Sequence, residues 1–272
     1  MTNNIDEYFD KLSSLLLSFT CYYNEKVIQK ILNEERYADE PERFYFTIVS
    51  KTNGSLDVAN LLIRNFYYKP HFHPSLFIII RSILSDIVVG EYVNMTAKDD
   101  ADIKEKIDSI YSDHIVRIYK SINKSYAQLD EWTQDRIEEE QKKALAAHPK
   151  YLDLLGKPKF KLISFQEMIH EIFLQKTSDQ DFSVYREIYS NYDMFSKYEH
   201  FGELSFHLLH KPFTERSIRE KFADVYQCIK ITITVLRIYC SIWGDLLSEE
   251  MEVLQKMSED IFQYDLGFLP EE

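Results

Sequence analysis

The chain has 272 residues, a mass of 32.5 kDa and a formal net charge of −13. This length is enough for one large domain with a sizeable core. The isoelectric point near 5.1 argues against a generally basic surface that would bind nucleic acid, but it does not argue against one local basic groove. Only 6 glycines and 7 prolines occur, and sheet folds with many tight turns need more of both, so a mostly helical fold is predicted.

The cysteines and the apolar stretches bear on the compartment. The 3 cysteines show neither CxxC spacing nor an even-numbered framework, which indicates reduced thiols in a cytosolic protein. The segment Met1–Lys11 carries acidic residues where a secretory signal has a basic region. The most apolar stretches, Leu76–Val89 and Ile229–Trp243, are interrupted by charged residues and fall short of the roughly 18 uncharged residues of a membrane span. We therefore expect a soluble, cytoplasmic protein.

Hydrophobic spacing predicts the helices of the first half. Apolar residues at intervals of three and four predict a helix from about Asn4 to Glu35. Asn53–Gly54 is a turn signal, after which Ser55 would cap a helix that ends near Tyr68. After a proline-flanked loop, the helix Leu76–Met95 is apolar on nearly every side, as is typical of the central helix of a bundle.

The middle of the chain differs from both ends. Asp99–His148 is highly charged and predicts an exposed helical hairpin. Beyond it, the pair Ser217 and Glu220 has the spacing of a capping box. The predicted helices of this half are Ser164–Leu174, Phe182–Leu209, Ile218–Leu247 and Ser248–Tyr264. The predicted fold is all-α: a single-domain helical bundle over residues 1–272, with a charged helical hairpin inserted at residues 99–148.

Ionisable residues inside apolar helices are candidate site residues. Arg81 and Asp86 lie in the predicted central helix, and Lys230 and Arg237 lie in the long late helix. A buried charge without a partner costs several kcal/mol, so each residue should meet an opposite charge from another helix. We expect Asp86 to pair with Lys230 or Arg237. Structural pairing and a functional polar cluster are both open.

A histidine-rich stretch is the candidate metal site. His200, Glu203, His207 and His210 fall at i, i+3, i+7 and i+10, which places them on one stripe of a continuous helix. Imidazole and carboxylate groups ligate zinc or iron. The alternative is a half-buried stripe at a helix interface, and on that interpretation no cofactor is expected. A divalent metal on His200, Glu203 and His207 is the competing hypothesis.

Arg64 and His71 are separated by six residues. This spacing resembles the Arg…His pattern of HEPN-type ribonucleases, an all-helical family common in bacterial defence and toxin systems. The resemblance implies that Arg64 and His71 act on RNA at a dimer interface. Histidine would then be the acid or base, and arginine would stabilise the developing phosphate charge.

Two further stretches resemble an uncharacterised all-helical bacterial family of unknown function. The first is Ile78–Asp86, with its Arg-Ser pair, and the second is Tyr185–Tyr189 followed by Ser196–His200, with its Ser-x-Tyr-x-His pattern. The family usually has glutamate four residues after the arginine, where this chain has Ser85. The resemblance implies that Arg81, Asp86 and His200 converge in one polar pocket.

Two functional hypotheses follow from these patterns. The first is a binding or interaction module of a bacterial defence, toxin or mobile-element system, which contacts a protein partner or a second copy through Asp99–His148. The alternative is an enzyme acting on RNA or a phosphate ester, either an HEPN-like ribonuclease or a metal-dependent hydrolase. RNA is expected only under this alternative, and no membrane partner is expected. The catalytic candidates of the alternative are Arg81, Asp86, Arg186, His200 and His207.

Overall fold

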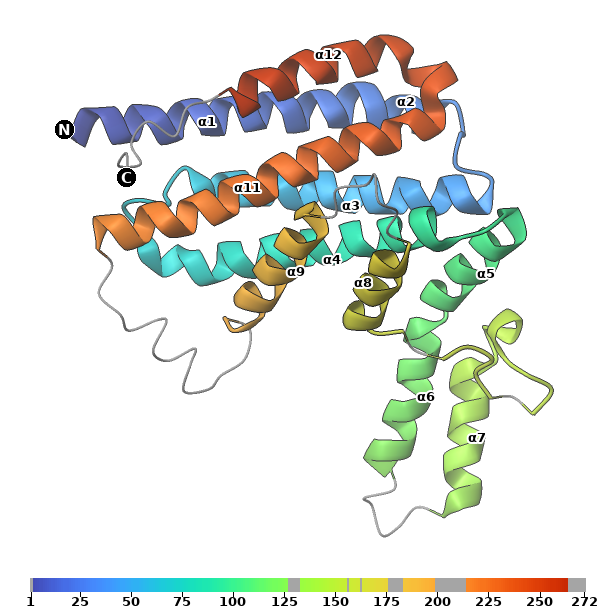
Figure 1. Cartoon of the computed structure of the whole chain (residues 1–272). Coiled ribbons are helices and arrows are strands. Elements are labelled where there is room, and N and C mark those ends of the chain that lie inside the picture. Colours follow the sequence, from blue (N-terminus) through green and yellow to red (C-terminus); the bar gives the residue numbers. More distant parts are fainter. Residues whose placement is uncertain are drawn as a thin grey trace. The chain divides into compact units, whose positions relative to one another are not determined.

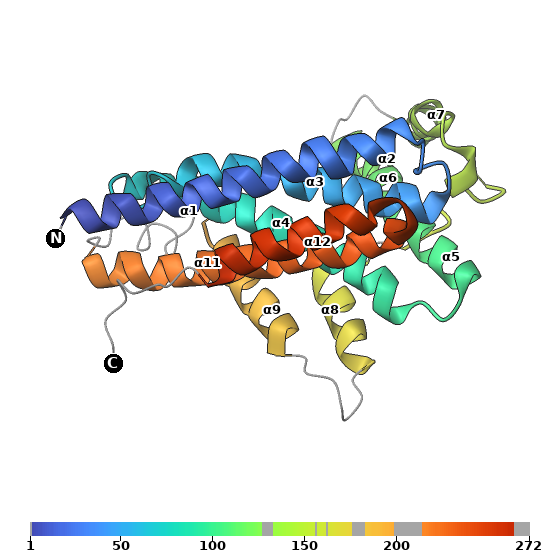
Figure 2. The ribbon, with the colours of Figure 1, turned by 90° about the horizontal axis from the view of Figure 1, so that it is seen from above.

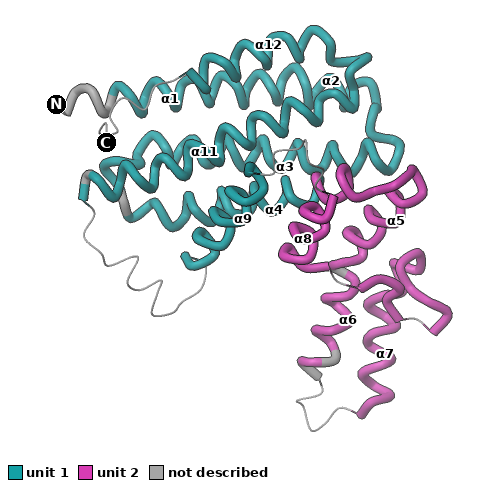
Figure 3. Tube along the Cα trace, in the orientation of Figure 1, with its two compact units in different colours: residues 1–90, 176–272 teal, residues 91–175 magenta. Residues whose placement is uncertain are grey.

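A computed structural model shows the protein to be all-α, as predicted. It describes residues 2–126, 133–155, 157–161, 163–175, 183–198 and 214–263. In these segments the regular elements are helices, apart from an isolated β-bridge between Leu152 and Pro158. The chain divides into two compact units: unit 1 comprises residues 1–90 and 176–272, and unit 2 comprises residues 91–175 (Figure 3). The division falls within helix α4 (His73–Thr96), and the predicted hairpin at 99–148 lies inside the range of unit 2.

Long helices from both ends of the chain make up unit 1. Its α1 packs against α3 and α12, and α11 packs against α3, α12 and the shorter α9. Figure 1 and Figure 2 show the long helices running side by side. The bounds of these helices are α1 (Thr2–Tyr22), α3 (Glu40–Ile63), α9 (Ser183–Ser196), α11 (Glu215–Cys240) and α12 (Gly244–Phe262).

The first predicted helix is present but is not uniform. A π-helical turn, Tyr23–Ile28, follows α1, and α2 (Gln29–Asn33) continues from it. Tyr23 is fully buried at this turn, and its hydroxyl donates to the carbonyl of Leu236 at 3.1 Å. The helix ends where Glu35 adopts a left-handed backbone, with φ at 51°. The turn thereby places a buried tyrosine hydroxyl against α11.

The turn and cap predicted at residues 53–55 are wrong. Helix α3 runs through Asn53 and Gly54 without a break. The side chain of Asn53 is buried and donates from Nδ2 to the carbonyl of Thr20 on α1 at 3.2 Å. The turn signal is overridden here because α3 packs against α1, where the amide nitrogen of Asn53 finds a carbonyl acceptor.

The late helices also begin and end at other residues than expected. The N-cap of α11 is Thr214, whose hydroxyl accepts from the amide of Ser217 at 3.1 Å. Ser217 is therefore the N3 partner in a capping box and not the cap. Helix α9 ends at Ser196, short of the predicted end at Leu209, and residues 199–213 lie outside the described part of the chain.

Aromatic side chains fill the interior of unit 1. Phe222 lies 4.7 Å from Phe9 and 5.2 Å from Phe66 between ring centroids. At Gly90, a Cβ atom would collide with the side chain of Tyr239, so α4 and α11 approach closely there. Within the described residues, the span Arg216–Phe262 is long and apolar enough to cross a membrane by composition, but 56% of its most apolar window is buried, as in a core helix.

Unit 2 is built from shorter helices. Its α5 (Asp100–Tyr111) contacts α6 (Asp113–Tyr126), which packs along α7 (Gln134–Leu145). A 3₁₀ turn at Pro149–Tyr151 leads toward α8 (Phe165–Leu174). Ser164 caps α8 in a capping box with Glu167, which confirms the short helix predicted over Ser164–Leu174. The fully buried core of this unit is aliphatic: Val93, Ile107, Ile115, Leu145 and Ile172.

Candidate functional site

Arg81 and Asp86 are directed to different neighbours. The Nη2 atom of Arg81 donates to the hydroxyl of Tyr192 at 2.9 Å, and the guanidinium lies 4.6 Å from the centroid of that ring. Asp86 instead forms an ion pair with Lys51 on α3, at 2.7 Å between Nζ and Oδ1. Residues five apart on a helix point to different faces. The structure therefore shows Arg81 against α9 and Asp86 against α3.

The partner predicted for Asp86 is wrong. Lys51, and not Lys230 or Arg237, forms the ion pair with this carboxylate in the described residues. Burial raises the pKa of Asp86, and Lys51 opposes that rise. Lys230 places its ammonium over the ring of Tyr226 instead, 5.1 Å from the centroid. The Lys51–Asp86 pair joins α3 to α4, which is a structural role.

The other predicted catalytic residues are scattered. Arg186 is exposed on α9. Arg64 is also exposed and pairs with Asp10 on α1 at 2.8 Å. His71 is exposed in a 3₁₀ turn, Pro70–Phe72, and its ring makes an edge contact with Phe72. The contacts of Arg64 and His71 thus lead to different neighbours.

The predicted metal stripe lies outside the described residues. This applies to His200, Glu203, His207 and His210, so a metal on these side chains stays a prediction. Among the residues that the structure does describe, no group of three histidine, cysteine or carboxylate side chains is placed to hold a metal ion.

His73 is a buried histidine of unit 1. Its Nε2 atom lies 2.7 Å from the carbonyl of Phe66, and its ring stacks on the ring of Phe66 at 3.9 Å between centroids. A carbonyl only accepts, so Nε2 carries the proton of the neutral imidazole. Burial lowers the pKa of His73 to about 4. Sequence reasoning missed this residue because nothing local distinguishes it from His71.

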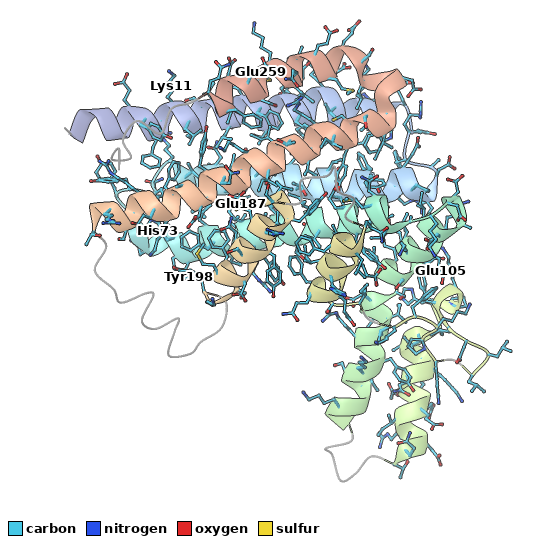
Figure 4. All side chains as sticks on the ribbon, viewed as in Figure 1. Lys11, His73, Glu105, Glu187, Tyr198 and Glu259 are labelled. Carbon is cyan, nitrogen blue, oxygen red and sulfur yellow. The ribbon has the colours of Figure 1, made fainter. Side chains whose placement is uncertain are left out.

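Glu187 on α9 and Asp224 on α11 form a further polar group in unit 1. Gln227 donates from Nε2 to Glu187 at 3.2 Å. The pKa of Asp224 is raised, first by burial and then by the negative charges of Glu187 and Glu220. Burial, with a contribution from Asp224, also raises the pKa of Tyr198. Figure 4 labels Glu187 and Tyr198 among these side chains. Glu187 and Tyr198 lie in the two stretches quoted for the resemblance to the uncharacterised family, whereas no sequence motif marked Asp224 or Gln227.

The described residues of unit 2 form a cavity that is a candidate ligand site. We call it the unit 2 pocket. Its volume is about 480 Å³, within the usual range for a small-molecule site. Helices α5 and α8 and the segment between Lys159 and Ile163 form its walls, and Glu105 projects from α5 (Figure 4). The lining residues are Tyr92, Asp102, Glu105, Lys106, Ser109, Lys159, Phe160, Lys161, Ile163, Glu167 and Glu171.

Lys106 is the most constrained charge in the unit 2 pocket. Its side chain is only 15% exposed, and Nζ lies 4.5 Å from the ring centroid of Tyr92. The ammonium donates to the hydroxyl of Tyr92 at 3.2 Å and lies 3.9 Å from Glu171. Burial is the largest cause that raises the pKa of Tyr92, which keeps the phenol neutral. The cation is thus held in place by an aromatic face, a hydroxyl and a carboxylate.

Charges of both signs line the pocket. The carboxylates come from α5 and α8, while Lys159 and Lys161 come from the segment that precedes α8. Glu167 accepts the amide of Ser164, which lowers its pKa and keeps it ionised. Lys159 donates to the carbonyl of Lys150 at 3.0 Å. The repeated acidic residues of α5 and the four-residue spacing of Glu167 and Glu171 on α8 could have indicated one acidic face on each helix. Only the fold brings these two faces together.

The comparisons with known proteins supply no further guide. No protein-family model, no curated protein and no solved structure matches this chain.

Proposed function

We propose that this protein is a binding module and that the unit 2 pocket recognises a small zwitterionic ligand. The observation that carries the proposal is a pocket of about 480 Å³ that is lined by both carboxylates and lysines. A ligand with an ammonium at one end and a carboxylate or phosphate at the other has a group for each kind of charge to bind. The volume suits a molecule of about dipeptide size.

Each end of such a ligand has a group to meet. Glu105 and Glu171 accept from the ammonium, and Lys161 donates to the anionic end. Lys106 already faces Glu171 and Tyr92, so it serves to fix the acidic wall. Phe160 and Ile163 supply apolar contact between the ends. Hydrogen bonds to charged groups each contribute about 1.5–3 kcal/mol to such binding.

The test uses isothermal titration calorimetry with one dipeptide in three forms. Alanyl-leucine carries both charges, its N-acetyl form lacks the ammonium, and its C-terminal amide lacks the carboxylate. We expect each blocked form to bind about tenfold or more weakly than the zwitterion, the loss of one charge-assisted contact. Binding of all three forms with equal affinity, or of none, would overturn the proposal.

Matched variants locate the site. Glu105→Gln should lower the affinity for the zwitterion and leave the affinity for the N-acetyl form unchanged, because the acetylated end carries no charge for Glu105 to bind. Lys161→Gln should lower the affinity for the zwitterion and leave the affinity for the C-terminal amide unchanged. The control is Glu138→Gln, an exposed carboxylate on α7 of the same unit that does not line the pocket.

A second candidate function is the hydrolysis of RNA or another phosphate ester in unit 1. Its support is the pair of polar groups that interact with α9: Arg81 with Tyr192, and Asp224 with Glu187. A carboxyl with a raised pKa suits a general acid or base, and arginine suits a phosphate. Asp224→Asn should abolish ribonuclease activity without a change in melting temperature. Full activity in that variant would exclude the role.

The setting proposed from the sequence is unchanged. We propose a cytoplasmic protein of a bacterial defence, toxin or mobile-element system, with a protein partner or a second copy of the chain. This part of the proposal rests on the two family resemblances and on the cysteine usage.

A further inference from the structure

Residues 152–155 and 157–158 of unit 2 belong to a tight turn, which we call the leucine turn. Leu152 and Pro158 pair as an antiparallel β-bridge at its base. The amide of Asp153 donates to the carbonyl of Lys157 at 2.8 Å, and the amide of Lys159 donates to the carbonyl of Tyr151 at 2.9 Å. Backbone hydrogen bonds therefore hold the two ends of the turn together.

The side chain of Asp153 fixes the tip. Its Oδ1 atom accepts the amides of Leu155 and Lys157, both at 2.8 Å. This carboxylate mimics a backbone turn, as is typical of aspartate at such positions. Leu155 and Lys157 are thus held in place by Asp153 before the turn meets any partner, and less conformational freedom is lost on binding.

Two leucines at the tip are the most exposed large apolar side chains among the described residues. Leu154 is fully exposed and Leu155 is 76% exposed. Figure 3 shows this turn extending away from the helices of unit 2. Single exposed leucines need no explanation, but adjacent ones on a rigid projecting turn indicate an interaction site.

The base of the leucine turn is basic. Lys150 and Lys159 flank it, and Lys157 is exposed within it. The only acid of the turn, Asp153, is occupied by the two backbone amides. Lys150 is compensated by Asp108 at 2.6 Å, whereas Lys157 has no ion pair with any described residue. Apolar groups therefore lie at the tip, and positive charge lies behind them.

We propose that the leucine turn docks on an anionic lipid bilayer, a partner that the sequence analysis did not expect. Leu154 and Leu155 enter the hydrocarbon boundary, and Lys157 faces the lipid phosphates. A convex apolar tip needs no matched cavity in a bilayer, whereas a protein partner would have to supply one. The turn has an apolar tip with positive charge behind it, which matches a membrane surface, where anionic headgroups lie outside the hydrocarbon. The −13 net charge of the chain is screened beyond a Debye length of about 8 Å, so the local lysines determine the contact.

Vesicle co-sedimentation of the full-length chain tests this inference. The probes are vesicles of phosphatidylcholine alone and vesicles that contain about one-third phosphatidylglycerol, an anionic lipid. We expect binding to the anionic vesicles only, weakened at high salt. Leu154→Ser/Leu155→Ser should lower the partition coefficient about tenfold or more, since both leucines lose their burial. Lys157→Gln should lower it by a few-fold.

The control is Leu174→Ser, which removes another exposed leucine of unit 2 and should bind as the wild type does. Melting temperatures should be equal in all variants, because the substituted side chains are exposed. Equal binding to both vesicle types, or full binding by the double-serine variant, overturns the proposal. A dimer in light scattering that the same variant dissociates, without vesicle binding, overturns it in favour of a second copy. The inference does not depend on the unit 2 pocket.

Discussion

The two units differ in what fills their interiors. The largest fully buried side chains of the described residues all belong to unit 1, among them Trp243, Tyr23 and Phe222. Unit 2 has an aliphatic core of smaller side chains, and seven of the eleven residues that line its pocket are charged. Large aromatic groups bury more surface per residue. Unit 1 is therefore the stabilising part of the chain, and unit 2 keeps its polar groups accessible for recognition.

The largest effect is expected from the aromatic core of unit 1. Trp243 is fully buried and donates from Nε1 to the carbonyl of Arg36 at 2.7 Å. Trp243→Ala should lower the free energy of unfolding by about 3–5 kcal/mol, because it leaves a cavity and an unpaired carbonyl. Urea unfolding followed by circular dichroism measures this. A loss below about 1 kcal/mol would contradict the assignment of stability to this core.

A matched pair of substitutions compares the units directly. Leu16 in unit 1 and Leu145 in unit 2 are both fully buried, so their replacement by alanine removes the same atoms. Leu→Ala costs about 2–5 kcal/mol, and the larger values come from rigid surroundings. We expect Leu16→Ala to lower the free energy of unfolding by an amount near the upper end of this range, and Leu145→Ala by an amount near its lower end. The reverse order in thermal unfolding would break the comparison.

His73 makes the stability of unit 1 depend on pH. Its pKa is about 4 in the folded chain and close to 6.5 when exposed, so the unfolded state binds more protons between these values. Stability should therefore be complete above about pH 6.5 and fall by about 2 kcal/mol by about pH 5. His73→Phe should remove this slope between neutral pH and about pH 5. An unchanged slope would show that another group is responsible.

The smallest effect is expected on the charged surface of unit 2. Arg117 and Asp113 form an i,i+4 ion pair at 2.6 Å on α6, and the arginine side chain is 71% exposed. Arg117→Ala should change the free energy of unfolding by only about 0.3–0.5 kcal/mol, since solvent screens the pair. Raising the salt concentration should remove the difference. A loss comparable to that of Leu145→Ala would mean that charge, and not packing, stabilises unit 2.

Local patterns predicted the fold class and most helices because they act over short distances. The scarcity of glycine and proline indicated an all-α chain, and the spacing of apolar residues located α4 and α8. The turn expected at Asn53 failed for the opposite reason. Its amide nitrogen donates to the carbonyl of Thr20, which is distant in sequence, so the local preference was overridden.

The candidate sites depend on tertiary contacts that the spacing of residues along the chain does not reveal. Sequence reasoning named Arg81 and Asp86, but the fold selected Tyr192 and Lys51 as their neighbours. The unit 2 pocket collects residues of α4, α5 and α8, which share no motif. Composition and periodicity by themselves determined the helical class, because they follow from backbone geometry and apolar burial. Tertiary structure alone decided which charges are buried, paired or exposed, because these depend on which distant helix packs against each side chain.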